Sequence, residues 1–149
     1  MGEGFFTKAI HAGEEPCPTT GALNPPIYQS TVFVFKSAEE AAAIFSEEAP
    51  GYVYTRWGNP TLSMLERKLA ELEGGEDALV TASGMAAVTT AILTLVESGD
   101  HIVCSKGVYT GTYVFLSQTL KRFGVEVDFV DGTCPSEVEE AIKPNTRLI

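Results

Sequence analysis

The stretch Asp77–Asp100, DALVTASGMAAVTTAILTLVESGD, decides the fold class of this chain. It predicts a strand over 78–82, a tight turn at Ser83-Gly84 and an apolar helix over 85–97. The first N–H groups of such a helix have no intrahelical partners, and the positive end of the helix dipole lies behind them. Gly84 also lacks the Cβ that would keep an anion away from the backbone. The unit therefore predicts a seat for a phosphate group, with a turn that serves packing alone as the alternative.

Other motifs of strand–turn–helix units are absent from the sequence. A nucleophile elbow needs a glycine two residues before and after its serine, whereas Thr81 and Met85 stand in those places around Ser83. Neither a P-loop nor a G-x-G-x-x-G pattern occurs. The predicted anion seat thus rests on a bare helix N-terminus.

The segments on either side of this stretch alternate between helix and strand patterns. A capping box at Ser37 and Glu40 opens a short helix, and Asn59-Pro60 opens an amphipathic one that Gly74-Gly75 ends. Further on, strand patterns occupy 101–105, 125–130 and, in its beginning, 146–149, and helix patterns occupy 110–123 and 135–142. This alternation predicts an α/β fold with a mostly parallel sheet and helices on both faces.

Residues 1–36 are rich in proline and glycine and show no useful helical or strand period. We expect an extended arm that lies across another subunit, since a long structureless segment is unusual inside a compact domain. The resulting division is an arm with a short helix for inter-subunit contacts (1–60), followed by the first part of the α/β domain (61–149). Because the sequence stops within a strand pattern, we expect it to be the truncated N-terminal part of a longer protein.

Composition limits the possible partners. Of the 149 residues 44% are hydrophobic, and the formal net charge is -10, which argues against nucleic-acid binding. No apolar run is long enough to span a membrane. Three cysteines without a C-x-x-C pair fit a cytoplasmic protein. His11 and His101 have no second ligand at metal spacing, so we expect no metal site.

Five motifs, in this order, resemble the Cys/Met-metabolism family of enzymes that depend on pyridoxal 5'-phosphate (PLP): NPPIYQST (24–31), YTRWGNPT (54–61), LEGG (72–75), ASGMAA (82–87) and VYTGTY (108–113). The resemblance covers nearly the whole chain. It implies the fold-type I PLP transferase architecture, PLP as cofactor and a small amino acid as substrate. It also implies a homo-oligomer, with a homotetramer expected.

The resemblance assigns roles to five residues. The backbone of Gly84 and Met85 would hold the cofactor phosphate, and Tyr54 and Arg56 would reach the phosphate in the neighbouring subunit. Tyr109 would stack on the pyridine ring and act in catalysis by transferring a proton near the departing sulfur or oxygen. The charged donor matters because a helix dipole contributes only about 0.3–1 kcal/mol, whereas a hydrogen bond to a charged group contributes about 1.5–3 kcal/mol.

The resemblance implies γ-elimination or γ-replacement on cystathionine, methionine or O-acyl-homoserine substrates. Methionine γ-lyases commonly carry cysteine where this chain has Gly111, so we favour a cystathionine or homoserine-ester enzyme, with methionine γ-lyase as the alternative. The cofactor-binding lysine of the family follows a Ser-x-Thr pattern that none of the lysines here has, so we expect this span alone to be inactive. The other class left open is a non-catalytic phosphate-binding or assembly module, which would lack such a lysine altogether.

Overall fold

The computed structural model describes residues 4–149, and the first three residues of the predicted arm lie outside this range. The chain forms two compact units, which divide between Val80 and Thr81. The functional division at residue 60 stays a prediction. Among the described residues, no helix combines the length and the apolar character needed to cross a bilayer.

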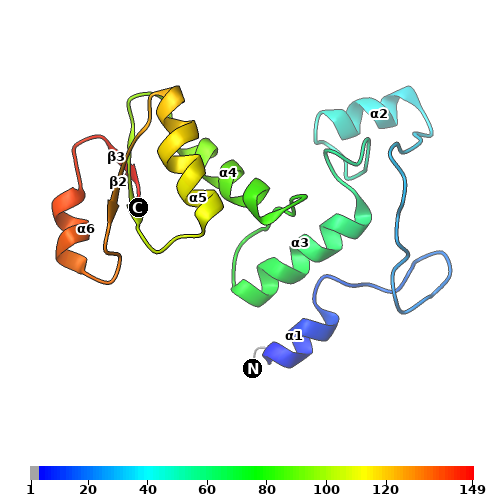
Figure 1. Ribbon diagram of the computed structural model, residues 1–149. Helices are drawn as coiled ribbons and strands as arrows, with labels where there is room; N and C mark the ends of the chain where they lie inside the picture. The colour runs from blue at the N-terminus through cyan, green and yellow to red at the C-terminus, as the bar shows by residue number, and fades with distance from the viewer. Residues whose placement is uncertain (1–3) are drawn as a thin grey trace. The chain divides into compact units, whose positions relative to one another are not determined.

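The first unit contains three helices, α1 (Phe5–His11), α2 (Ala38–Phe45) and α3 (Pro60–Glu73) (Figure 1). Helix α1 corrects the sequence prediction, because the arm is not extended throughout. Its seven residues are too few to form a stable helix alone. They pack beside α3, where Lys8 Nζ lies 3.0 Å from Glu71 Oε2 and Lys68 pairs with Glu14. Contacts with α3 thus stabilise a helix that the local sequence pattern does not predict.

The boundaries of α2 and α3 follow the predicted caps. Ser37 Oγ accepts a hydrogen bond from the Glu40 N–H at 3.1 Å, and Asn59 Oδ1 accepts one from the Thr61 N–H at 2.9 Å. Gly74 ends α3 in the left-handed conformation, with φ 70°, as expected for a C-terminal glycine. The Glu40 carboxylate accepts from the Lys36 N–H, one residue before the position that an ideal capping box uses.

The second unit is an α/β structure. In chain order its elements are α4 (Gly84–Leu95), β1 (His101–Ser105), α5 (Thr110–Val114), a π-helical turn η1 (Phe115–Thr119), a 3₁₀ turn η2 (Leu120–Phe123), β2 (Glu126–Val130), α6 (Pro135–Ala141) and β3 (Thr146–Leu148). The strands form a parallel sheet in the order β2-β1-β3, with His101 paired with both Glu126 and Thr146. This confirms the predicted fold class.

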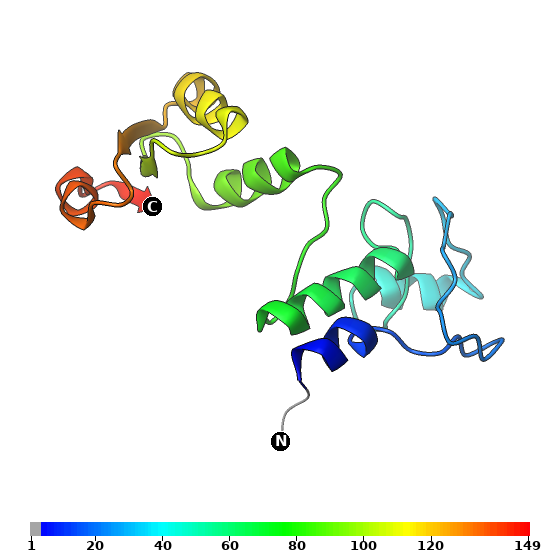
Figure 2. The same cartoon turned by 60° about the horizontal axis from the view of Figure 1, so that its bottom comes forward.

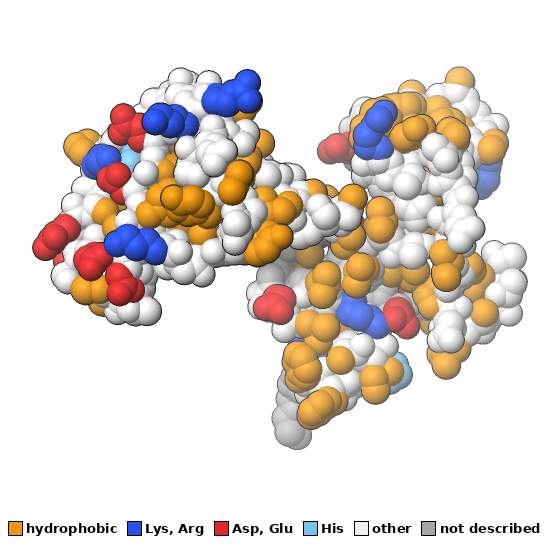
Figure 3. All heavy atoms as spheres, in the orientation of Figure 1, with side chains coloured by type: hydrophobic (Ala, Val, Ile, Leu, Met, Phe, Trp, Pro, Cys, Tyr) orange, Lys and Arg blue, Asp and Glu red, His pale blue; other side chains and the backbone are white. Residues whose placement is uncertain are grey.

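Helices flank this sheet on two sides. Figures 1 and 2 both show α6 on the side of the sheet opposite α5. The core beneath α5 and its continuation consists of Ile102, Leu116, Leu120 and Val125, which Ile92 of α4 helps to cover. Figure 3 shows many apolar side chains at the surface over α4 and α5. Leu93, Leu95 and Tyr109 are exposed residues of this unit.

Two predicted segments, 78–82 and 110–123, differ in detail from the structure. Residues 78–82 were predicted to form a strand, but they form none and pair with no strand among the described residues. The N–H of Val80 instead donates to Glu66 Oε1 of α3 at 3.0 Å. The predicted helix over 110–123 is helical throughout, yet its hydrogen bonding changes from α to π to 3₁₀ along its length. Hydrophobic periodicity locates helical residues but does not distinguish these three patterns.

Candidate functional site

The N-terminus of α4 leaves two backbone donors free. Ser83 is its N-cap: the side-chain Oγ accepts from the Ala86 N–H at 3.1 Å, and the carbonyl oxygen accepts from the Ala87 N–H at 3.1 Å. Within residues 4–149, the N–H groups of Gly84 and Met85 have no partner. A Cβ built on Gly84 would meet no protein atom within 4 Å. The corner therefore offers two adjacent N–H donors and open space in front of Gly84, as an anion seat requires.

The start of α5 lies against the start of α4. The Oγ1 of Thr112 is 3.9 Å from the sulfur of Met85. A Cβ built on Gly111 would lie 3.1 Å from the same sulfur and 2.6 Å from Cε1 of the Tyr109 ring. The structure thus brings three of the residues singled out in the sequence, Gly84, Met85 and Tyr109, to one region of the second unit. Tyr109 as a residue is 72% exposed.

Tyr54 and Arg56 lie together in the first unit. The guanidinium carbon of Arg56 is 5.0 Å from the centre of the Tyr54 ring, within the range of a cation–π contact. Arg56 is exposed and has no ion pair with any described residue. Its loop borders a cleft of about 500 Å³ that residues 77–80 also line. An unpaired guanidinium beside a cleft is suited to binding an anion.

Asn59 has a larger role than the N-cap predicted from the sequence. Its side chain is buried, and its amide nitrogen donates to the Tyr28 carbonyl at 3.0 Å and to Thr55 Oγ1 at 3.1 Å. In addition, Thr61 Oγ1 accepts from the Tyr28 N–H at 2.9 Å. These bonds hold the motif 24–31 against the motif 54–61. The sequence indicated the N-cap at Asn59 but not this link to the motif 24–31.

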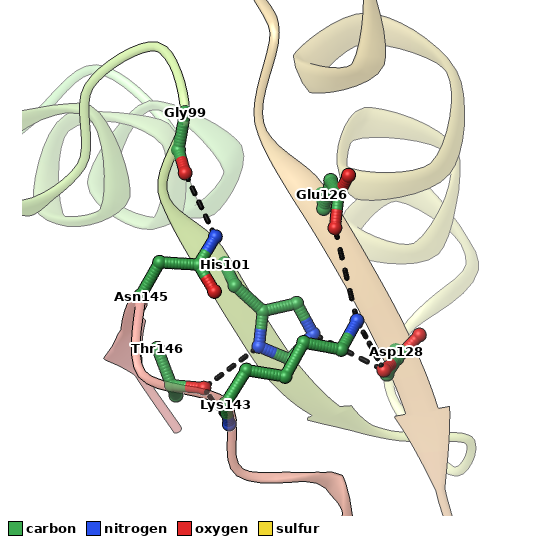
Figure 4. Close-up of polar contacts among 7 residues, drawn as sticks. All are labelled: Gly99, His101, Glu126, Asp128, Lys143, Asn145 and Thr146. Carbon is green, nitrogen blue, oxygen red and sulfur yellow. Dashed lines mark hydrogen bonds and ion pairs between the residues drawn. The ribbon is translucent and has the colours of Figure 1, made fainter.

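A buried histidine lies at the edge of the sheet where the strands begin (Figure 4). His101 is fully buried. Its Nδ1 is 2.8 Å from Thr146 Oγ1, and its Nε2 is 3.2 Å from Asp128 Oδ2. The ring is therefore hydrogen-bonded to β3 through Thr146, while its Nε2 lies beside Asp128 of β2 without making a hydrogen bond. Ligands of open α/β sheets bind at the carboxyl ends of the strands, so this cluster belongs to the opposite edge.

Lys143 completes the cluster. Its Nζ lies 2.8 Å from Asp128 Oδ2 and 3.7 Å from Glu126 Oε2. The hydrogen bond from Lys143 lowers the pKa of Asp128, and the same bond raises the pKa of Lys143. Periodicity predicted the strands but gave no indication of this polar connection, because its partners are separated widely in sequence.

One further titratable side chain, Cys104, lies on β1. Burial raises the pKa of the Cys104 thiol, which packs against the core cluster, as expected for a structural thiol. Among residues 4–149, no group of three or more His, Cys, Asp or Glu side chains is placed to hold a metal ion.

Comparison with known proteins decides the family. The model of the family described as "Cys/Met metabolism PLP-dependent enzyme" matches residues 6–149. The chain belongs to this family. The resemblance seen in the five motifs is thereby confirmed, and PLP is the cofactor on which the family depends.

The relatives include more than one activity. The chain is 49% identical to an L-methionine gamma-lyase of Porphyromonas gingivalis, over 100% of the chain and 37% of that protein. It is 48% identical to an O-acetyl-L-homoserine sulfhydrylase of Corynebacterium glutamicum, over 97% of the chain and 33% of that protein. The chain therefore spans about a third of the length of these relatives.

Solved structures agree with the fold. The crystal structure of metB from Corynebacterium glutamicum matches with a TM-score of 0.88 and 41% identity, covering 97% of this chain and 36% of that one. The structure of metY from Campylobacter jejuni matches with a TM-score of 0.90 and 36% identity, covering the same shares, and contains N'-pyridoxyl-lysine-5'-monophosphate.

Proposed function

We propose that this chain forms the phosphate-binding part of a PLP enzyme that carries out γ-elimination or γ-replacement on a sulfur-containing or O-acyl-homoserine amino acid. The observation that carries the proposal is the pair of unpartnered N–H groups at Gly84 and Met85, in a family that depends on PLP. The residues fit the group: two adjacent donors and the dipole of a 12-residue helix face open space.

The side chains of this chain have separate tasks in the proposed site. Gly84 and Met85 bind phosphate oxygens through the backbone, and Arg56 supplies a positive charge beside the Tyr54 ring. Tyr109 holds the plane of the pyridine ring by stacking, and its phenol group moves a proton at the departing sulfur or oxygen atom. When bound, PLP supplies the electron sink for breaking bonds at the substrate.

The proposal extends to the assembly. Tyr54 and Arg56 would serve the site of a neighbouring subunit in a homo-oligomer, for which we propose a homotetramer.

The three cysteines are free thiols, which suits the reducing cytoplasm that we propose as the location. Because the cofactor-binding lysine has no counterpart here, residues 1–149 alone would not turn over substrate.

Substrate assays of the full-length protein test the function. With PLP, release of methanethiol from methionine would support a methionine γ-lyase, one of the two activities named among the relatives. Release of acetate from O-acetylhomoserine in the presence of sulfide would support an O-acetylhomoserine sulfhydrylase. Cleavage or formation of cystathionine would support a cystathionine γ-lyase or γ-synthase. If the full-length protein contains no Ser-x-Thr-Lys site and binds no PLP, the proposal of a PLP enzyme is wrong. The hypothesis of a non-catalytic phosphate-binding or assembly module would then remain.

A further inference from the structure

A carboxylate of α3 holds the segment that follows this helix. The half-buried Glu66 accepts a hydrogen bond at Oε1 from the Val80 N–H, at 3.0 Å. Residues 77–82 form no strand, so no sheet partner satisfies their backbone groups among the described residues. The segment's other hydrogen bonds within the described part of the chain join residues at most two positions apart. Glu66 is therefore its anchor to a distant part of the sequence.

The anchored residues form one side of the cleft that contains Arg56. Residues 77–80 line this cleft, together with Arg56, Leu62 and Glu66 among others, and all of its lining residues belong to the first unit. Leu62 and Glu66 lie on α3 at the i, i+4 spacing, which places two side chains on the same face of a helix. The bond between Glu66 and Val80 thus ties two sides of the cleft together.

The same bond determines what the Glu66 carboxylate does in the cleft. A carboxylate and a guanidinium attract each other, and an ion pair between Glu66 and Arg56 would occupy donors of the guanidinium. Among residues 4–149, neither Arg56 nor Glu66 forms an ion pair. The carboxylate is instead engaged by the Val80 N–H, which leaves Arg56 available to an external anion.

We infer that Glu66 is a positioning residue. By accepting the Val80 N–H, it keeps residues 77–80 in place beside Arg56 and stays out of an ion pair with this guanidinium. The inference rests on the proposed function where it concerns the cofactor phosphate, whereas the bond to Val80 concerns this chain alone. It follows that the reach of the acceptor oxygen matters at position 66, and its negative charge does not.

Three substitutions in the full-length protein separate the reach of the side chain from its charge. Glu66→Gln keeps an acceptor oxygen at the same reach without the charge, Glu66→Asp keeps the charge on a side chain that is one methylene shorter, and Glu66→Ala removes both. Glu73→Ala is the matched control. Glu73 is exposed on the same helix, and its carboxylate has no hydrogen bond or ion pair with the described residues.

Hydrogen exchange of the Val80 amide measures the bond whether or not a cofactor is bound. We expect exchange to accelerate about ten- to hundredfold in Glu66→Ala and Glu66→Asp, and by less than about threefold in Glu66→Gln and Glu73→Ala. A wild-type exchange rate in Glu66→Ala would overturn the inference. Exchange that is as fast in Glu66→Gln as in Glu66→Ala would overturn it as well.

Binding of PLP and of pyridoxal, which lacks the phosphate, measures the effect on the proposed site. Glu66→Ala and Glu66→Asp should weaken PLP about three- to tenfold and leave pyridoxal nearly unchanged, whereas Glu66→Gln and Glu73→Ala should bind both ligands as wild type does. Equal losses for the two ligands would show a structural role only, and unchanged or tighter PLP binding in Glu66→Ala would show no help to the phosphate. Each of these results overturns the inference.

Two further outcomes are covered by the same set of variants. If Glu66→Ala does not fold, Glu66→Asp carries both measurements, because it keeps the charge and most of the side chain. If wild-type protein binds no PLP, the proposed function fails, and exchange at Val80 still decides whether Glu66 holds residues 77–80.

Discussion

The Nζ of Lys143 lies 2.8 Å from the Oδ2 of Asp128, and this contact joins the turn before β3 to strand β2. Asp128 also lies beside the buried ring of His101. One carboxylate of the outer strand β2 thus contacts both Lys143 and the central strand β1. Both Asp128 and Lys143 are partly exposed to solvent, which screens their attraction. The contribution of this pair to stability is therefore small and depends on pH.

Replacement of Asp128 by Asn should lower the melting temperature only within a defined pH window. The folded pKa of Asp128 is lowered, so its contribution is present above the unfolded pKa of about 3.9 and is lost as pH falls through the folded pKa. The pKa of Lys143 is raised, so its contribution is present below about 10.4 and is lost as pH rises through the folded value.

Thermal unfolding of the full-length protein from acid to neutral pH measures this effect. The difference between Asp128→Asn and wild type should be constant near neutrality and should vanish at pH values below the folded pKa of Asp128. Glu139→Gln, which removes an exposed carboxylate of α6, is the control and should show little difference at any pH. A difference that grows on acidification would contradict the assigned direction.

Replacement of Asn59 by Ala should destabilise the protein by about 1–3 kcal/mol, because it removes an N-cap and a buried amide that donates to the Tyr28 carbonyl. It should also weaken PLP binding, since the segment that carries Arg56 would lose its attachment to residues 24–31. Urea unfolding and PLP titration measure the two effects. The exposed Asn24 provides the control, and an Asn24→Ala variant that loses as much stability would show that the loss is not specific to the buried amide.

Replacement of Leu120 by Ala should cost about 2–5 kcal/mol of unfolding free energy, as do other large-to-small changes at fully buried positions. Leu120 is 0% exposed and belongs to the core beneath α5. The same change at Leu93 of α4, which is 53% exposed, should cost far less. Similar denaturation midpoints for the two variants would contradict the described core.

The parallel sheet and most of the helices could be predicted because their evidence is local. Asn59-Pro60 and Gly74 mark both ends of α3, and the strand patterns at 101–105 and 125–130 lie within one residue of β1 and β2. The failures have a common cause, which is contact between residues far apart in sequence. Helix α1 depends on α3, and the Val80 N–H donates to Glu66 rather than to a strand.

The candidate site was predictable in part for the same reason. The free donors at Gly84 and Met85 follow from a short turn before a helix, and the roles of Tyr54, Arg56 and Tyr109 come from the family motifs and stay predictions. The links made by Asn59 and the packing of Gly111 against Tyr109 require coordinates, because no local pattern indicates which side chains meet.

The most direct test of the central claim compares the binding of PLP with that of pyridoxal, which lacks the phosphate, in full-length wild type and Arg56→Ala, with Arg122→Ala as the control. If Gly84, Met85 and Arg56 hold the phosphate, wild type should bind PLP more tightly than pyridoxal. Loss of one charged donor in Arg56→Ala should then weaken PLP about ten- to hundredfold and leave pyridoxal nearly unchanged. Equal losses for both ligands, or no loss for PLP, would contradict the account.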